Sequence, residues 1–337
     1  MTLDEKYLRQ RFEERIAGDV FAHARPSERP VTVLLGAQPG AGKTAGGNRV
    51  VDLYPPGEVI RIMGDDLRQY HPDYPDLMAT DPLQMPDATD AAMRRWIDMC
   101  VDYADEHNYS VLIERTWRSV DATLGSARQA ADQGRATHAV VVAVPPELSR
   151  LSTLGRYYRD VDSGKPARWT PPQVHDTAAA QLPHTVQQVA ASPDVDRFTV
   201  TDRSGAILFD SSEPGPDRGR DGFAAFEAAF KRTLTADERV HVLQDVPYLA
   251  KAHATHTMQE PTAREVIAWA EGFAQQVEAD GRAETAKGAA QAGFPVSAPQ
   301  EIRTLQQRTP TTPTNDRPEQ LRAASPDLPS RSELDGR

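Results

Sequence analysis

The chain has 337 residues, enough for one large α/β domain with additions or for two modest domains, with a formal net charge of -11 and a single cysteine, Cys100. Strong acidity argues against a general nucleic-acid binder, one cysteine excludes an internal disulfide, and no run approaches the ~20 apolar residues of a membrane span. The N-terminus has no apolar run behind a basic start, so we expect a cytoplasmic protein without a signal peptide.

Predicted strands and helices alternate through the first two thirds of the chain. In chain order, we expect a helix at 4–23, a strand at 31–35, a strand at 58–62, a helix at 88–107, a strand at 110–114, a helix at 119–133, a strand at 138–144, a helix to about 161, a helix at about 171–190, and a hairpin of strands at 198–201 and 206–209. Strands that alternate with helices predict a parallel sheet covered on both faces.

The last third of the chain has a different composition. Residues 213–220 are rich in Pro, Gly, Asp and Arg, which indicates a domain edge. Two or three helices fit into 221–284. From about 285 large apolar residues almost disappear, and this composition predicts a disordered tail.

The Gly-rich segment at 36–44, Gly-Ala-Gln-Pro-Gly-Ala-Gly-Lys-Thr, follows the first strand directly. In the phosphate-loop pattern, four residues separate the first Gly from Gly-Lys-Ser/Thr. Ala37 occupies the position of that first Gly, with Gly36 just before it. A chance Gly-rich turn is the alternative, but a strand before the segment and a helix after it favour a phosphate site at a helix N-terminus. We expect the nucleotide to be bound by Gly40, Ala41, Gly42, Lys43 and Thr44, with the Thr44 hydroxyl on Mg²⁺.

Polar residues follow two further strands. Asp65 and Asp66 come after the second strand, where a carboxylate either accepts a proton from a substrate hydroxyl or caps the next helix, and the spacing leaves both interpretations open. Glu114 lies at the carboxyl end of the third strand, with Thr116 and Arg118 just after it, either beside a substrate or in a solvated loop.

Two arginines lie in later polar segments. Arg156 is in Leu-Gly-Arg-Tyr-Tyr-Arg at 154–159, and Arg168 is in Lys-Pro-Ala-Arg-Trp-Thr-Pro at 165–171. The forked donors of arginine suit a transferring phosphoryl group. Taken singly, each is better interpreted as an ordinary surface arginine.

In order and spacing, these segments resemble the zeta toxin family of toxin–antitoxin systems over about residues 30–212. The matching motifs are the Gly-rich segment at 36–44, Gly64-Asp65 with His71-Pro72, residues 112–118, Ala143-Val144-Pro145, Arg156-Tyr157, residues 167–171, and Val174-His175-Asp176. Ala37 departs from the family pattern, and so does Arg115, which stands where small residues are usual.

The resemblance implies a kinase that uses ATP and Mg²⁺ to phosphorylate UDP-N-acetylglucosamine at the 3′-hydroxyl of the amino sugar. Such an enzyme blocks cell-wall precursor synthesis and is neutralised by a small helical antitoxin. The implied catalytic residues are Asp65 as base with Lys43, Arg156 and Arg168 on the phosphates. The implied substrate-binding residues are Asp65, Asp98, Glu114, Thr116 and Arg118.

We therefore expect an α/β fold with a P-loop kinase-like parallel sheet and helices on both faces. The expected parts are an N-terminal helix at 1–29, a zeta-toxin-like kinase domain at 30–212, a helical extension at 213–285 and a disordered tail at 286–337. We expect no nucleic-acid or membrane partner. The helix at 4–23, or the C-terminal helices, would modulate activity or bind the antitoxin.

Two other functions remain open. A related kinase would act on another hydroxyl, that of an antibiotic, a nucleoside or a dinucleotide. A protein that had lost its chemistry would serve only as a nucleotide-binding interaction module. The presence of Lys43, Asp65, Glu114, Arg156 and Arg168 argues against that last possibility.

Overall fold

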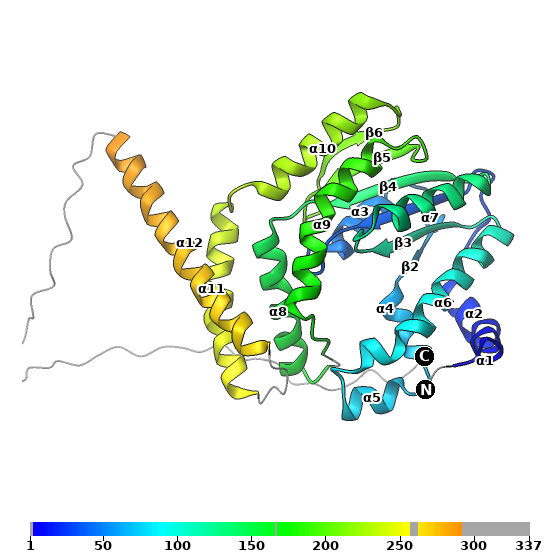
Figure 1. Ribbon diagram of the computed structural model, residues 1–337, viewed down its shortest axis with the longest axis horizontal. Helices are drawn as coiled ribbons and strands as arrows, with labels where there is room; N and C mark the ends of the chain where they lie inside the picture. Colours follow the sequence, from blue (N-terminus) through cyan, green and yellow to red (C-terminus); the bar gives the residue numbers. More distant parts are fainter. Residues whose placement is uncertain (1–2, 166, 257–261, 292–337) are drawn as a thin grey trace, which may run out of the picture. The chain divides into compact units, whose positions relative to one another are not determined.

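The computed structural model describes residues 3–165, 167–256 and 262–291 (Figure 1). These residues contain a six-stranded sheet in the order β2-β3-β1-β4-β5-β6. The strands are β1 (Val31–Gly36), β2 (Val59–Ile62), β3 (Ser110–Arg115), β4 (Ala136–Val142), β5 (Arg197–Thr201) and β6 (Ile207–Ser211). All neighbouring strands are parallel except β6, which runs antiparallel to β5. The predicted fold class and the predicted terminal hairpin are confirmed.

The central strand β1 is buried along its whole length. Leu34 packs into an apolar cluster on one face of the sheet, whereas Val33 and Leu35 pack into a second cluster on the other face. Alternate residues of a strand point to opposite faces, so a strand with helices on both sides must be apolar at every position. This requirement explains the continuous apolar run at 31–35.

Helices form a layer on each side of the sheet (Figure 1). The first cluster includes side chains of α1 (Glu5–Arg11), α6, α7, α9 and α10. The second includes side chains of α3, α8, α11 and α12. The helices from α3 onward are α3 (Lys43–Val51), α4 (Gly64–Leu67), α5 (Tyr74–Thr80), α6 (Met85–Glu106), α7 (Val120–Asp132), α8 (Pro146–Asp162), α9 (Pro172–Ala191), α10 (Pro216–Lys231), α11 (Ala236–Thr255) and α12 (Ala263–Gln291). None of the helices in the described ranges combines the length with the apolar content that a membrane span needs.

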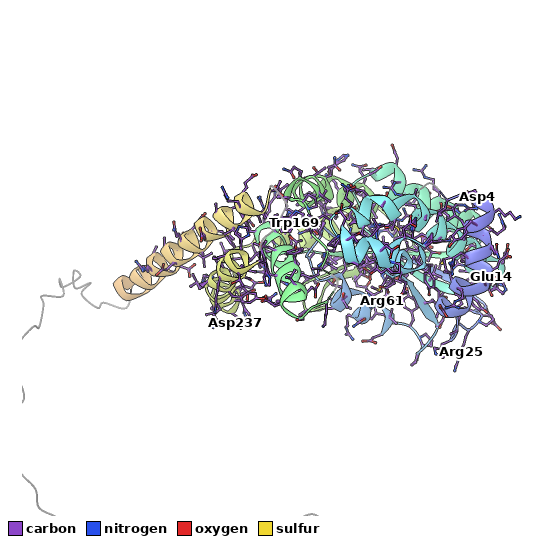
Figure 2. All side chains as sticks on the ribbon, turned by 90° about the horizontal axis from the view of Figure 1, so that it is seen from below. Asp4, Glu14, Arg25, Arg61, Trp169 and Asp237 are labelled. Carbon is purple, nitrogen blue, oxygen red and sulfur yellow. The ribbon has the colours of Figure 1, made fainter. Side chains whose placement is uncertain are left out.

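The N-terminal helix predicted at 4–23 is part of the core. It runs as α1 (Glu5–Arg11), a π-helical stretch at Phe12–Ile16 and α2 (Ala17–Val20), with Asp4 and Glu14 labelled in Figure 2. The Asp4 carboxylate accepts a hydrogen bond from the backbone N–H of Tyr7 at 2.7 Å and caps the first turn. Phe12 and Ile16 are buried against the first cluster. Removing this helix would therefore expose apolar core.

The C-terminal helices α10 and α11 pack against the central fold. Helix α10 contacts α9, β5 and β6, and places Phe226 and Phe230 in the first cluster, while α11 contacts α8. The compact unit extends to Thr285. Helix α12 continues to Gln291, so the start of the predicted disordered tail, 286–291, is helical; 292–337 lie outside the described residues. The division into domains at 29, 212 and 285 stays a prediction.

Candidate active site

The Gly-rich loop connects the end of β1 to α3, which begins at Lys43. Gly42 caps this helix with a φ of 89°, and Gly40 has a φ of 78°. Glycine adopts these left-handed values without steric cost. The first N–H groups of a helix have no intrahelical acceptor, and together with the helix dipole they form a ready anion site. The loop has the backbone that the predicted phosphate site requires.

The start of the loop explains why the sequence has alanine at a position where the pattern has glycine. A Cβ atom at Gly36 would lie 2.1 Å from Cδ2 of the Trp117 indole, so only glycine leaves room for that ring. Trp117 is 2% exposed and has a φ of 50°. Ala37 is fully buried and lies outside the left-handed region. In this chain the steric need for glycine is therefore at position 36 and not at position 37.

Replacing Gly36 by alanine should lower the free energy of unfolding by about 1–3 kcal/mol, because the new methyl group overpacks a buried ring. Gly125 is the matched control: it lies in α7, and a Cβ there would meet nothing within 4 Å. Gly125→Ala should raise the free energy of unfolding by about 0.5–1 kcal/mol through helix propensity. Urea unfolding of both variants checks this, and equal midpoints would contradict the role given to Trp117.

Four charged side chains act electrostatically on the Lys43 ammonium. Burial lowers the pKa of Lys43 most, and the positive charges of Arg156 and Arg168 lower it further, while the carboxylates of Glu114 and Asp65 raise it. These residues come from three segments: Asp65 from α4, Glu114 from β3, and the two arginines from α8 and the loop that follows it. The fold thus brings together five residues that the sequence predicted separately.

Asp65 is held by two arginines. Arg168 Nη1 forms an ion pair with Asp65 Oδ1, and Arg68 Nε lies 3.3 Å from the same oxygen. Burial opposes ionisation of Asp65, but the adjacent Arg168 and Arg68 outweigh it, and the pKa of Asp65 lies below its usual value. The N-cap of α4 is Met63, with no side-chain cap, so neither Asp65 nor Asp66 caps this helix.

Glu114 lies at the carboxyl end of β3 and is bound by Arg61 of β2 (labelled in Figure 2). Arg61 Nη2 donates to Glu114 Oε1 at 2.5 Å, and Arg61 Nη1 donates to Asn48 Oδ1 of α3 at 2.5 Å. The Glu114 side chain is largely buried. Arg61 thereby connects the helix that begins at Lys43 to the strand that ends at Glu114.

Arg156 and Arg168 lie on the same side of the cluster. Arg156 Nη2 is 3.5 Å from the Thr170 hydroxyl, and Arg168 follows α8 in the same loop. Burial and then the positive charge of Arg168 lower the pKa of Arg156. The neighbouring Trp169 is buried in the second cluster beside side chains of α11 and α12, and Figure 2 labels it. Two arginines whose positive charges repel each other in this way are suited to bind an anion.

The remaining predicted residues lie at the margin of the cluster. Asp98 lies on the exposed side of α6; partial burial raises its pKa, and the positive charges of Arg115 and then Arg95 oppose this shift. Asp98 is not among the groups that shift Lys43. Thr116 is half-buried and Arg118 exposed in the loop after β3. The five central residues are therefore coupled electrostatically to one another through Lys43. Asp98 is instead coupled to Arg115, so a role for Asp98 requires a substrate that extends to that residue.

Two positioning residues, Arg61 and Arg68, were not predicted from the sequence. Arg68 is buried and also donates to the Pro86 carbonyl at 2.6 Å and to the Thr89 hydroxyl at 2.7 Å, both on α6. Its spacing of three residues from Asp65 on a helical turn was the available signal. The pairing of Arg61 with Glu114 depends on strand register and has no signal in local sequence.

A separate hollow of about 450 Å³ lies between the N-terminal helices and the segment after α4. Arg11, Arg15, Asp19 and Tyr70 are among its lining residues. No residue of the charged cluster lines it. The chemistry implied by the cluster therefore belongs at the strand ends and not in this hollow.

The model of the family described as Zeta toxin matches residues 14–213. The chain belongs to the zeta toxin family. Toxin PezT of Streptococcus pneumoniae serotype 4 is 28% identical over 213 residues, which cover 62% of this chain and 84% of that protein. Toxin zeta of Enterococcus hirae is 29% identical over 212 residues, which cover 63% of this chain and 72% of that protein.

A solved structure from the PezAT chromosomal toxin–antitoxin system of Streptococcus pneumoniae has the same fold. It aligns with a TM-score of 0.64 and 22% identity, covering 74% of this chain and 98% of that chain. The zeta toxin match ends at residue 213, just before α10. Helices α10, α11 and α12 therefore lie outside the residues that the family model matches.

Proposed function

We propose that this zeta toxin family member is an ATP-dependent kinase that phosphorylates UDP-N-acetylglucosamine at the 3′-hydroxyl of the amino sugar. The observation that carries the proposal is the convergence of Asp65, Glu114, Arg156 and Arg168 around Lys43. A base, a cation at a helix N-terminus and paired arginines are the parts that phosphoryl transfer needs.

Asp65 accepts the proton of the attacking sugar hydroxyl and orients its oxygen toward the γ-phosphorus of ATP. As the new oxygen–phosphorus bond forms, the bond from the γ-phosphorus to the bridging oxygen of ADP breaks. Lys43, Arg156 and Arg168 stabilise the charge on the phosphate oxygens during transfer. Arg168 forms an ion pair with Asp65, so the arginine that would stabilise the phosphate lies next to the proposed base.

Magnesium fits this site with Thr44 as its protein ligand. Thr44 lies exposed in the first turn of α3, and the described residues contain no group of three or more His, Cys, Asp or Glu side chains that could hold a metal. Mg²⁺ commonly takes one or two protein oxygens and completes its shell with phosphates and water. When bound, it neutralises charge on the β- and γ-phosphates.

The proposal is tested by ADP release from purified full-length protein with Mg·ATP, with and without UDP-N-acetylglucosamine. Strong stimulation by the sugar nucleotide, with a phosphate recovered on its amino sugar, is the expected result. ATP binding without stimulation by any acceptor would reject the kinase and revive the interaction module.

A second acceptor class is favoured by one observation. Arg115 is a large cation at the margin of the cluster, with Asp98 as a nearby carboxylate, where the family pattern has a small residue. A different acceptor shape would suit this margin, such as an antibiotic, a nucleoside or a dinucleotide. An acceptor panel separates the two: ADP release that only a different hydroxyl compound stimulates would retain the kinase and replace its substrate.

We also propose that the chain acts as a toxin neutralised by a helical antitoxin, on the basis of its family and of relatives named as toxins. Deleting residues 1–24 is a poor test, because Phe12 and Ile16 would leave the core. Co-expression with the product of the adjacent reading frame is a better one. Arrest of growth that this product relieves is the expected outcome, and growth unaffected by the chain alone would contradict the toxin role.

A further inference from the structure

The side chain of Gln38 connects the phosphate loop to the helix beneath it. Gln38 is 0% exposed, its Nε2 donates to the Val144 carbonyl at 2.9 Å, and the same nitrogen lies 3.3 Å from the Ser149 hydroxyl of α8. The backbone is equally close: a Cβ on Gly40 would lie 2.0 Å from the Ser149 carbonyl oxygen. The loop therefore rests on the first turn of α8 through both its side chain and its backbone.

Ser149 connects in turn to His175 on α9. The Ser149 hydroxyl lies 2.8 Å from His175 Nε2, and His175 Nδ1 lies 2.9 Å from Asp176 Oδ1. Ser149 and His175 are 0% and 1% exposed. Because Nδ1 faces a carboxylate it carries the ring proton, so Nε2 is an acceptor for the Ser149 hydroxyl, which also lies 2.9 Å from the Pro146 carbonyl. The Ser149 oxygen in turn accepts from Gln38, so these contacts connect the loop to Asp176.

The contacts continue beyond the part of the chain that the family defines. Arg150 Nη1 lies 3.4 Å from Asp176 Oδ2, and the Arg150 guanidinium stacks 4.4 Å from the centre of the Trp269 ring on α12. A cation over an indole face is attracted by the ring quadrupole. The Arg150 guanidinium thus contacts both Asp176 of α9 and Trp269 of α12.

Buried hydrogen bonds restrict side chains to one arrangement, and a supporting shell of this kind commonly holds a binding site in its productive geometry. Val174-His175-Asp176 is one of the motifs of the family resemblance, and the reaction described above gives it no role. Among the residues that the structure describes, the hydrogen-bond partners of His175 are Ser149 and Asp176, and neither belongs to the charged cluster.

We propose that His175 is a positioning residue that holds the phosphate loop in its ATP-binding shape through Ser149 and Gln38, and that Arg150 and Trp269 extend this support to α12. The inference rests on the proposed function only in that the loop binds ATP. It is independent of which acceptor is phosphorylated.

The test is the Kd of Mg·ATP for the full-length protein, measured by titration calorimetry, in the wild type, His175→Leu, His175→Gln and Ser149→Ala. His175→Leu and Ser149→Ala should each raise the Kd about tenfold, because each leaves buried polar groups of the network without partners. Glutamine places an amide near the position of Nε2 and should restore the Kd to within about threefold of the wild type. The KM for the acceptor should be unchanged in all three variants.

His138 provides a matched control. It is a second buried histidine, 1% exposed, and it bonds to the side chains of Tyr54 and Thr199. His138→Leu should lower the unfolding temperature without changing the Kd of Mg·ATP. Wild-type affinity in folded His175→Leu and Ser149→Ala would overturn the inference. Equal weakening in His138→Leu would overturn it as well, because the effect would then be general destabilisation.

A separate variant tests the contact between Arg150 and Trp269 of α12. Trp269→Leu keeps an apolar side chain but removes the ring face under Arg150, and should raise the Kd about threefold. An unchanged Kd would overturn the link. If the wild type binds Mg·ATP but phosphorylates no sugar nucleotide, the proposed substrate is wrong and the positioning role still holds. If the wild type binds no ATP, both proposals are overturned.

Discussion

Asp65→Asn should lower turnover by about 10²–10⁴-fold, the range typical of a lost general base. The asparagine amide has nearly the same shape as the carboxylate but cannot accept the proton of the attacking hydroxyl. In the structure Asp65 is the second residue of the short helix α4 after β2, and the adjacent Arg168 and Arg68 hold its carboxylate ionised. Acceptor-dependent ADP release under saturating Mg·ATP measures the effect.

The loss in Asp65→Asn must be separated from a structural defect. Arg68 keeps its bonds to Pro86, Thr89 and Asp90 in that variant, so the turn that carries residue 65 should remain in place. The Kd of Mg·ATP and the unfolding temperature should therefore change little. Asp66→Asn, one residue away, serves as the matched control and should retain turnover. Normal turnover in Asp65→Asn, or an equal loss in Asp66→Asn, would reject Asp65 as the base.

The fold could be predicted because its signals are local. The apolar run of β1, the glycines of the loop and the alternation of strands with helices each come from short stretches of sequence. Boundaries were less accurate where tertiary contacts decide them. The strand predicted at 138–144 is β4 at 136–142, because the Val144 carbonyl bonds to the buried Gln38 side chain and does not continue the ladder. Such a contact has no trace in the segment itself.

The candidate site could be predicted in part, for a related reason. Parallel strands end at one edge of a sheet, so polar residues that follow β1, β2 and β3 had to lie near one another. Lys43, Asp65 and Glu114 follow this rule. Arg61 and His175 could not be assigned, because their partners lie 53 and 26 residues away and depend on register and helix packing. The support of the site is thus encoded by the fold as a whole.

Lys43→Met should lower turnover by about 10²–10³-fold, the typical effect of removing one preorganised stabiliser of transition-state charge. Methionine retains an unbranched apolar stem but has no ammonium group to meet the phosphates. Lys43 is the first residue of α3, and its ammonium is attracted by two carboxylates and repelled by two arginines, so it adds positive charge at the helix N-terminus where an anion would bind. The Kd of Mg·ATP should rise in the same variant, measured by titration calorimetry.

The decrease in ATP affinity at alkaline pH tests the role of Lys43 in the wild-type protein, without a substitution. Burial and the two arginines lower the pKa of Lys43 from 10.5, so the free protein loses this charge at a lower pH than an ordinary lysine would. Affinity of the wild type for Mg·ATP should therefore fall as the pH rises through that lowered pKa. Lys43→Arg keeps its charge over this pH range and should show no such fall. Its overall affinity should be lower, because the planar guanidinium fits the phosphate loop less well than the compact ammonium. The same alkaline loss in Lys43→Arg would assign the titration to another group and remove Lys43 from the phosphate site.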